Sequence, residues 1–185
     1  MFRKFKVRDV VFLAVLAAVT TLFGALAMPV MKSTLFGVQT LVTCLFYSLF
    51  AVVGLRKVRK PGALALFGLL TGFPLLFMAP VMFFNNFIGA LLAEALVLLL
   101  FRGYEQKTAV ITGASLFMIL TMPLSLPFSM WLNGKSHENF LNGVWWQSAL
   151  VFAGVIALSV AGAFIGWKIA DELQKAGKLR PYGED

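Results

Sequence analysis

Cysteine and histidine are scarce in this chain of 185 residues, with one of each. A single cysteine, Cys44, permits no internal disulfide and no CxxC metal knuckle. A single histidine, His137, excludes a metal site built from several histidines. We therefore predict no metal site and no cofactor.

Sequence motifs of enzymes are missing as well. The chain has no GxxxxGK[ST] loop, whose backbone donors hold nucleotide phosphates, and neither HExxH nor GxSxG occurs. No aspartate lies within the apolar stretches described next, which excludes paired membrane aspartates for acid and base catalysis. These absences predict a protein that is not an enzyme and that does not hydrolyse ATP by itself.

Charged residues are the third shortage, at 13% of the chain against 60% apolar residues. Soluble domains carry about 25% charged residues, and the mean hydropathy here is +0.88. Six apolar stretches approach the roughly 20 residues that cross a bilayer as a helix, and none shows the alternation of a barrel strand. We predict one all-α domain, residues 1–185, with six transmembrane helices at about 10–30, 35–55, 62–79, 81–101, 108–131 and 144–167. Pro123 and Pro127 predict a kinked or unwound outer third of the fifth helix.

The net charge of +8 comes from basic residues between the apolar stretches, which indicates orientation in a membrane rather than nucleic-acid binding. With six helices, 14 of the 16 Lys and Arg residues fall on one side and only Lys32 and Lys135 on the other. Basic residues resist translocation, so we predict cytoplasmic N- and C-termini and a multi-pass protein of the bacterial cytoplasmic membrane. A competing interpretation of the first stretch is a secretory signal with a cleavage site at Ala25-Leu26-Ala27.

Three segments together resemble a known family of membrane subunits. They are the basic start RKFKVRDVVFLAVLAAVTT, the run from Asn86 to Glu94, and the glycine-rich end GAFIGWKIADELQKAGKL. In order, length and flanking charge the chain is similar to an S component of an energy-coupling factor (ECF) transporter, closest to the MptD-like or Trep_Strep subgroup. The resemblance implies capture of a vitamin or related ring compound outside the cell. It also implies delivery through a transmembrane coupling protein and two cytoplasmic ATPases.

The same resemblance implies two sites. Docking on the coupling protein would use Ala14 and Ala18 of the first helix, where small residues allow close helix approach, although packing inside the bundle is an alternative. Substrate would bind near the outer face. Polar, aromatic or thioether residues predicted there are Lys32, Met82, Asn85, Asn86, Trp131, His137, Trp145, Trp146 and Gln147. The tryptophans also fit an aromatic belt at the membrane surface, and the adjacent amides also fit a helix cap.

Glu94 is predicted near mid-membrane or deeper, where a carboxylate is costly, and we expect a structural or coupling role for it rather than substrate contact. Two alternatives to a vitamin-binding subunit stay open. One is a haem- or porphyrin-binding S component, with His137 or an outer methionine on the iron. The other is a membrane scaffold or assembly protein without a ligand.

Overall fold

The computed structural model describes residues 5–25, 37–77, 79–133 and 145–177, and within these ranges it contains six helices and no strand. The helices are α1 (Val7–Ala25), α2 (Val38–Lys57), α3 (Ala63–Leu76), α4 (Pro80–Phe101), α5 (Lys107–Asn133) and α7 (Trp145–Lys175). The predicted all-α class is confirmed. Five of these helices are long and apolar enough to cross a membrane, which suggests a multi-pass membrane protein.

α3 is the exception to the prediction of six spanning helices. It has 14 residues, so it is about 21 Å long at 1.5 Å per residue, which is less than the roughly 30 Å hydrocarbon core. The helix begins directly after Gly62, whose backbone is left-handed (φ 95°). Beyond its end, Ala79 is extended (φ −156°, ψ 114°) because the Pro80 ring disfavours helical backbone in the preceding residue.

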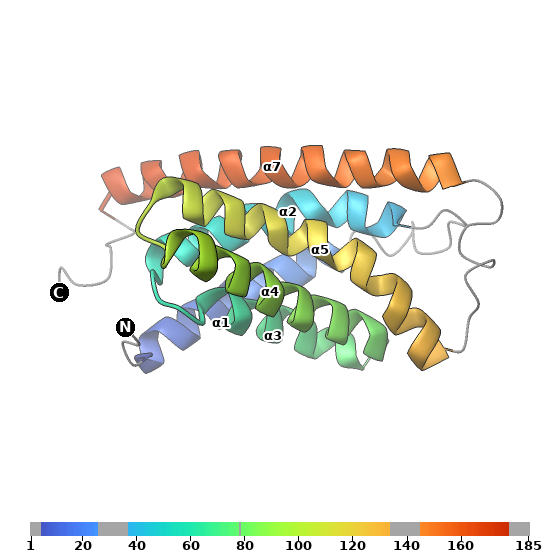
Figure 1. Ribbon diagram of the computed structural model, residues 1–185. Helices are drawn as coiled ribbons and strands as arrows, with labels where there is room; N and C mark the ends of the chain where they lie inside the picture. The colour runs from blue at the N-terminus through green and yellow to red at the C-terminus, as the bar shows by residue number, and fades with distance from the viewer. Residues whose placement is uncertain (1–4, 26–36, 78, 134–144, 178–185) are drawn as a thin grey trace.

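α5 is not unwound at its prolines, since it is helical throughout Lys107–Asn133. Its second half turns away from α7 (Figure 1). The hydroxyls of Thr121 and Ser125 donate to the carbonyls of Met118 and Met122 at 2.7 and 2.8 Å. Such bonds from Ser and Thr back to the preceding turn often accompany bent helices.

α7 continues two turns beyond the predicted end at residue 167. Its 31 residues are about 46 Å long at 1.5 Å per residue, so its last turns extend past a hydrocarbon core of about 30 Å. The extra turns are polar and contain exposed ion pairs of Lys175 with Asp171 and Glu172, at 3.5 and 2.8 Å. Because these turns are polar, the apolar stretch in the sequence ends before the helix does, and the length predicted for this helix was too short.

Two pairs of helices pack with their backbones in close contact. α7 runs alongside α2 (Figure 1), and a Cβ added at Gly162 or Gly166 would lie 2.4 Å from the carbonyl oxygen of Leu45 or 2.5 Å from that of Leu49. In the second pair, α3 and α4, a Cβ at Gly68 would lie 2.2 Å from the Cβ of Ala90. Small residues allow this approach where lipid supplies no hydrophobic drive for association.

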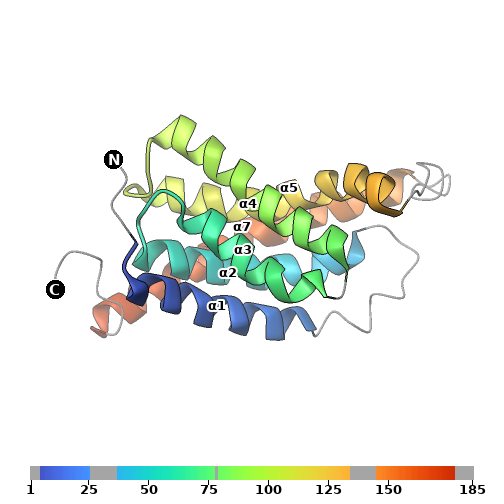
Figure 2. The same ribbon diagram turned by 90° about the horizontal axis from the view of Figure 1, so that it is seen from below.

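The remaining helices connect the two pairs. α5 packs against α4, α7 and α2, and α1 packs mainly against α2 and α3 along one edge of the bundle (Figure 2). The start of α1 and the end of α7 lie at the same end of the bundle, which we call the terminal end (Figure 1). The start of α2, the end of α5 and the start of α7 lie at the opposite end, which we call the loop end.

Candidate functional site

Asn85 is the most unusual residue of the loop end. It lies in the second turn of α4 and is only 8% exposed, yet its Oδ1 atom has no hydrogen-bond partner among the described residues. One turn further along α4, a Cβ on Gly89 would lie 3.1 Å from Thr121 of α5. A buried amide oxygen without a partner is destabilising, by about 1–3 kcal/mol. Asn85 therefore offers a buried hydrogen-bond acceptor at the loop end.

Gln39, in the first turn of α2, reaches the same region. Its Nε2 atom donates to the Sδ atom of Met82 at 3.9 Å. Met82 precedes Asn85 by three residues and therefore lies on the same side of α4. Two residues before Gln39, a Cβ on Gly37 (φ 83°) would lie 2.6 Å from the methyl group of Met122 in α5. Gln39 of α2 thus contacts Met82 of α4, Met122 of α5 lies beside the start of α2, and Asn85 lies one turn along α4 from Met82.

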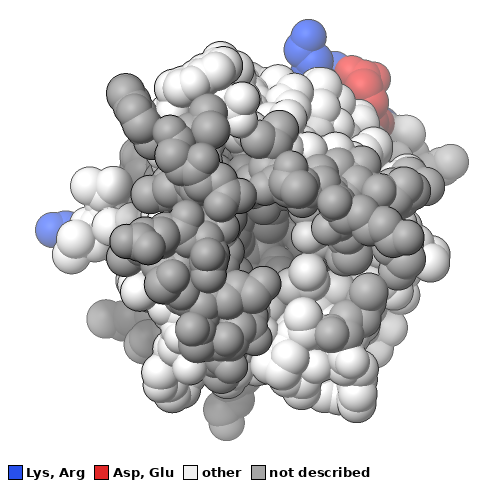
Figure 3. All heavy atoms as spheres, turned by 90° about the vertical axis from the view of Figure 1, so that its right-hand side faces the viewer, with Lys and Arg blue, Asp and Glu red and all other residues white. Residues whose placement is uncertain are grey.

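The described residues around this cluster of Gln39, Met82, Asn85 and Met122 are uncharged. None of the described residues at the loop end is Lys, Arg, Asp or Glu, over residues 37–44, 70–77, 79–90, 118–133 and 145–156. Figure 3 looks onto this end. The charged atoms of described residues that are visible in this view lie at its margin.

The other predicted substrate residues are placed differently. Asn86 donates from Nδ2 to the Met82 carbonyl at 3.0 Å, and its Cβ lies 3.4 Å from the position of an added Gly72 Cβ, so it lies at the contact with α3. Its Oδ1 atom, like that of Asn85, is buried without a partner among the described residues. Trp131 and Trp146 are 74% and 55% exposed, which fits the membrane-surface belt better than a ligand contact. Gln147 is half-buried. Lys32, His137 and the side chain of Trp145 lie outside the described residues.

The predicted docking residues lie on the outer side of α1. Ala18 is exposed and Ala14 is half-buried, while Ala17 is buried together with Leu13. The neighbouring Val11 and Val15 are also exposed. Ala14 and Ala18 therefore border an apolar surface that the described bundle does not cover, and it is Ala17 that packs internally.

Glu94 is bound to the start of α3. Its two carboxylate oxygens accept hydrogen bonds from the backbone N–H groups of Gly62 and Ala65, the latter at 2.8 Å. The first N–H groups of a helix lack partners within the helix and carry partial positive charge, so a carboxylate is stabilising there. Burial, and then the adjacent Glu94 carboxylate, raise the pKa of Tyr104. This arrangement favours a structural role for Glu94, at the terminal end and away from Asn85.

Replacing Glu94 with glutamine is expected to destabilise the protein without affecting a ligand at the loop end. Glutamine keeps one acceptor oxygen and turns an amide donor toward a backbone donor. A lost buried hydrogen bond of this kind is worth about 1–3 kcal/mol. The thermal midpoint in detergent should fall by several degrees, whereas Glu105→Gln, at an exposed residue, should leave it unchanged. An unchanged midpoint with loss of ligand binding would instead place Glu94 in the ligand site.

Asp9 and Lys60 form a buried ion pair at the terminal end. The two side chains are 7% and 2% exposed, and Nζ of Lys60 lies 2.7 Å from Oδ2 of Asp9. Oδ2 also accepts a bond from the backbone N–H of Lys6 at 3.2 Å. Asp9 is inside α1 although no predicted apolar stretch contains aspartate, because the helix begins at Val7, before the apolar run.

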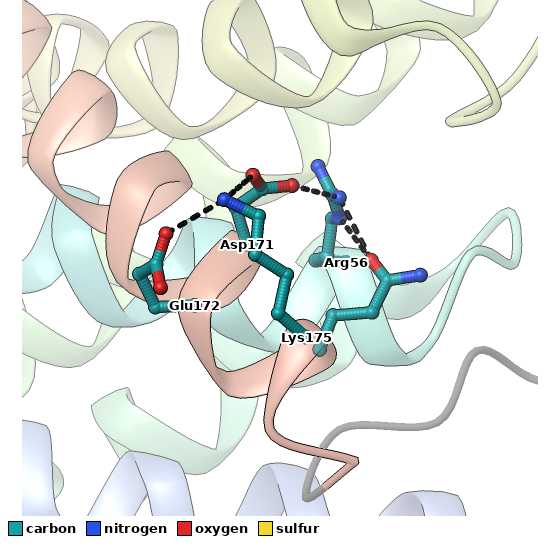
Figure 4. Close-up of polar contacts among 5 residues, drawn as sticks. Arg56, Asp171, Glu172 and Lys175 are labelled. Atoms are coloured by element: carbon teal, nitrogen blue, oxygen red, sulfur yellow. Dashed lines mark hydrogen bonds and ion pairs between the residues drawn. The ribbon is translucent and has the colours of Figure 1, made fainter.

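Arg56 connects α2 to the polar end of α7 (Figure 4). Its Nη2 atom donates to Asp171 at 2.9 Å and to Gln174 at 2.8 Å, and its guanidinium lies 3.7 Å from the ring centroid of Trp167. An arginine that is paired and stacked in this way orients rigidly. These contacts hold together at the terminal end the two helices that the glycines bring close along their length.

Comparison of the chain with protein-family models, with curated proteins and with solved structures found no match. The residue that sequence reasoning missed in the loop-end cluster is Gln39. The available signal was that it is the sole amide between residues 35 and 55.

Proposed function

We propose that the protein is the substrate-capture subunit of an ATP-driven importer of the ECF type and binds a small organic micronutrient at the loop end. The observation that carries this proposal is the buried Asn85, whose amide oxygen has no partner within the described part of the chain. A polar atom held in such a position becomes stabilising once a ligand supplies the missing hydrogen bond. The described residues around it are uncharged and include thioethers, which suit an organic ring because methionine side chains adapt to apolar shapes.

The orientation and the partners belong to the same proposal. The described basic residues lie away from the loop end, which fits a terminal end in the cytoplasm and a loop end outside. The exposed surface around Ala18 on α1 is available for a transmembrane coupling protein. Two cytoplasmic ATPases would then supply the energy, since the chain has no phosphate-binding loop of its own.

The test is to identify the ligand directly. Mass spectrometry of the protein purified from its native membrane should detect a co-purifying small molecule. The same compound, or a member of a panel of vitamins and haem, should raise the thermal midpoint in detergent. A concentration 100 times the Kd corresponds to about 2.7 kcal/mol of stabilisation. A response to haem alone would favour the porphyrin-binding alternative. No co-purifying compound together with no shift would favour the scaffold and overturn the proposal.

A further inference from the structure

The carboxamides of Gln39 and Asn85 come from two helices that scarcely contact each other directly. α2 packs on α7, α5 and α1, whereas α4 packs on α3 and α5. Gln39 contacts Met82, and Met82 lies one turn from Asn85 on the same side of α4. A molecule between them would therefore contact both close-packed helix pairs.

Each carboxamide has hydrogen-bonding capacity to spare. The Oδ1 atom of Asn85 is an acceptor without a partner in the described ranges. The amide of Gln39 donates to a thioether sulfur, which is a weak acceptor. A ligand that offers an N–H to Asn85 and a carbonyl oxygen to Gln39 would satisfy both groups better than the protein does alone.

The charge of the surroundings restricts the ligand further. A buried ionic ligand requires a compensating charge, because desolvating an unpaired ion costs several kcal/mol. The described residues around the cluster include none that could compensate it. Met82, which contacts Gln39, and Met122, which lies beside Gly37, fit the apolar body of a ring.

We propose that Gln39 and Asn85 together bind an uncharged heterocycle whose edge carries adjacent N–H and C=O groups, as in a lactam or a carboxamide. This inference rests on the proposed function and adds to it the chemical class of the substrate and the role of Gln39. Selection is by neutrality: an anionic derivative of the same ring is rejected, because none of the described residues around the two amides carries the charge that would pair with it.

The experiment compares matched neutral and anionic probes. Binding to the full-length protein in detergent is measured by thermal shift and titration calorimetry for uracil and orotate, nicotinamide and nicotinate, and riboflavin and its phosphate. Any compound that co-purifies is tested in the same way. The variants are Asn85→Leu and Gln39→Met. The matched control is Gln106→Leu, which also removes an amide but at an exposed position of the terminal end.

We expect a neutral probe to bind and its anionic partner not to bind. Asn85→Leu and Gln39→Met should each weaken binding about 10- to 100-fold, since each leaves one polar group of the ligand unpaired. Gln106→Leu should bind as the unsubstituted protein does. Asn85→Leu should also retain or raise the midpoint without ligand, because it removes a buried acceptor without a partner, so loss of binding cannot be attributed to unfolding.

Other outcomes separate this inference from the proposed function. Binding of an anionic probe alone, or of any compound with unchanged affinity in both variants, would overturn the inference while leaving a ligand-binding subunit. No binding of any probe or co-purified compound would overturn both.

Discussion

Replacing Lys60 with methionine is expected to lower the thermal midpoint of the detergent-solubilised protein by on the order of 10 °C. The substitution leaves the carboxylate of Asp9 buried without its cation, and breaking a buried ion pair from one side costs about 3–5 kcal/mol. For chains of this size, 1 kcal/mol corresponds to about 2–4 °C. The pair connects the first turn of α1 to the segment between α2 and α3, so its loss should also loosen α1.

A second substitution separates the ion pair from simple packing. In the variant carrying both Lys60→Met and Asp9→Leu no buried charge is left unpaired, so it should recover most of the lost stability. Lys175→Met, which removes an exposed partner of Glu172 (side chains 65% and 73% exposed), should barely change the midpoint. If Lys60→Met and Lys175→Met behave alike, the Asp9–Lys60 contact does not contribute as the geometry indicates.

The membrane class and the number of helices could be predicted because they depend on composition along short windows. Apolar runs of about 20 residues have few alternatives to spanning helices, since lipid satisfies no backbone polar group. The length of α3 could not be predicted in the same way. Its residues are as apolar as those of its neighbours, and it ends where the backbone before Pro80 becomes extended.

What could not be predicted from the sequence is mostly the contacts between residues that lie far apart in the chain. Glu94 was recognised as exceptional, but its partners are backbone N–H groups of another helix, which no side-chain pattern reveals. Lys60 stood in a basic segment and was interpreted as an orientation signal, although it is 2% exposed and paired with a residue 51 positions away. Asn85 was selected as a candidate substrate residue, and its burial without a hydrogen-bond partner among the described residues could be seen only once the helices were packed.

Substitution of the glycines between α2 and α7 is expected to have a comparably large effect. The Cβ of Gly162→Ala would lie 2.4 Å from the carbonyl oxygen and 3.0 Å from the Cα of Leu45, both backbone atoms of α2. Backbone atoms cannot move away from the new methyl group as the end of a flexible side chain can, so α2 and α7 must separate. Overpacking of this kind typically costs about 1–3 kcal/mol, occasionally more. Gly103→Ala is the matched control, because a Cβ there would meet nothing within 4 Å.

The consequence should extend to both ends of the helix pair. Separation of α2 from α7 would lengthen the contacts of Arg56 with Asp171 and Gln174 at the terminal end and displace Gln39 at the loop end. We therefore expect Gly162→Ala to lower the thermal midpoint and also to weaken binding of whichever compound stabilises the unsubstituted protein. Gly103→Ala should preserve both properties. A Gly162→Ala protein with an unchanged midpoint would show that α2 and α7 are not in close contact through these glycines. A lower midpoint with full affinity would show that ligand binding does not depend on the position of α2.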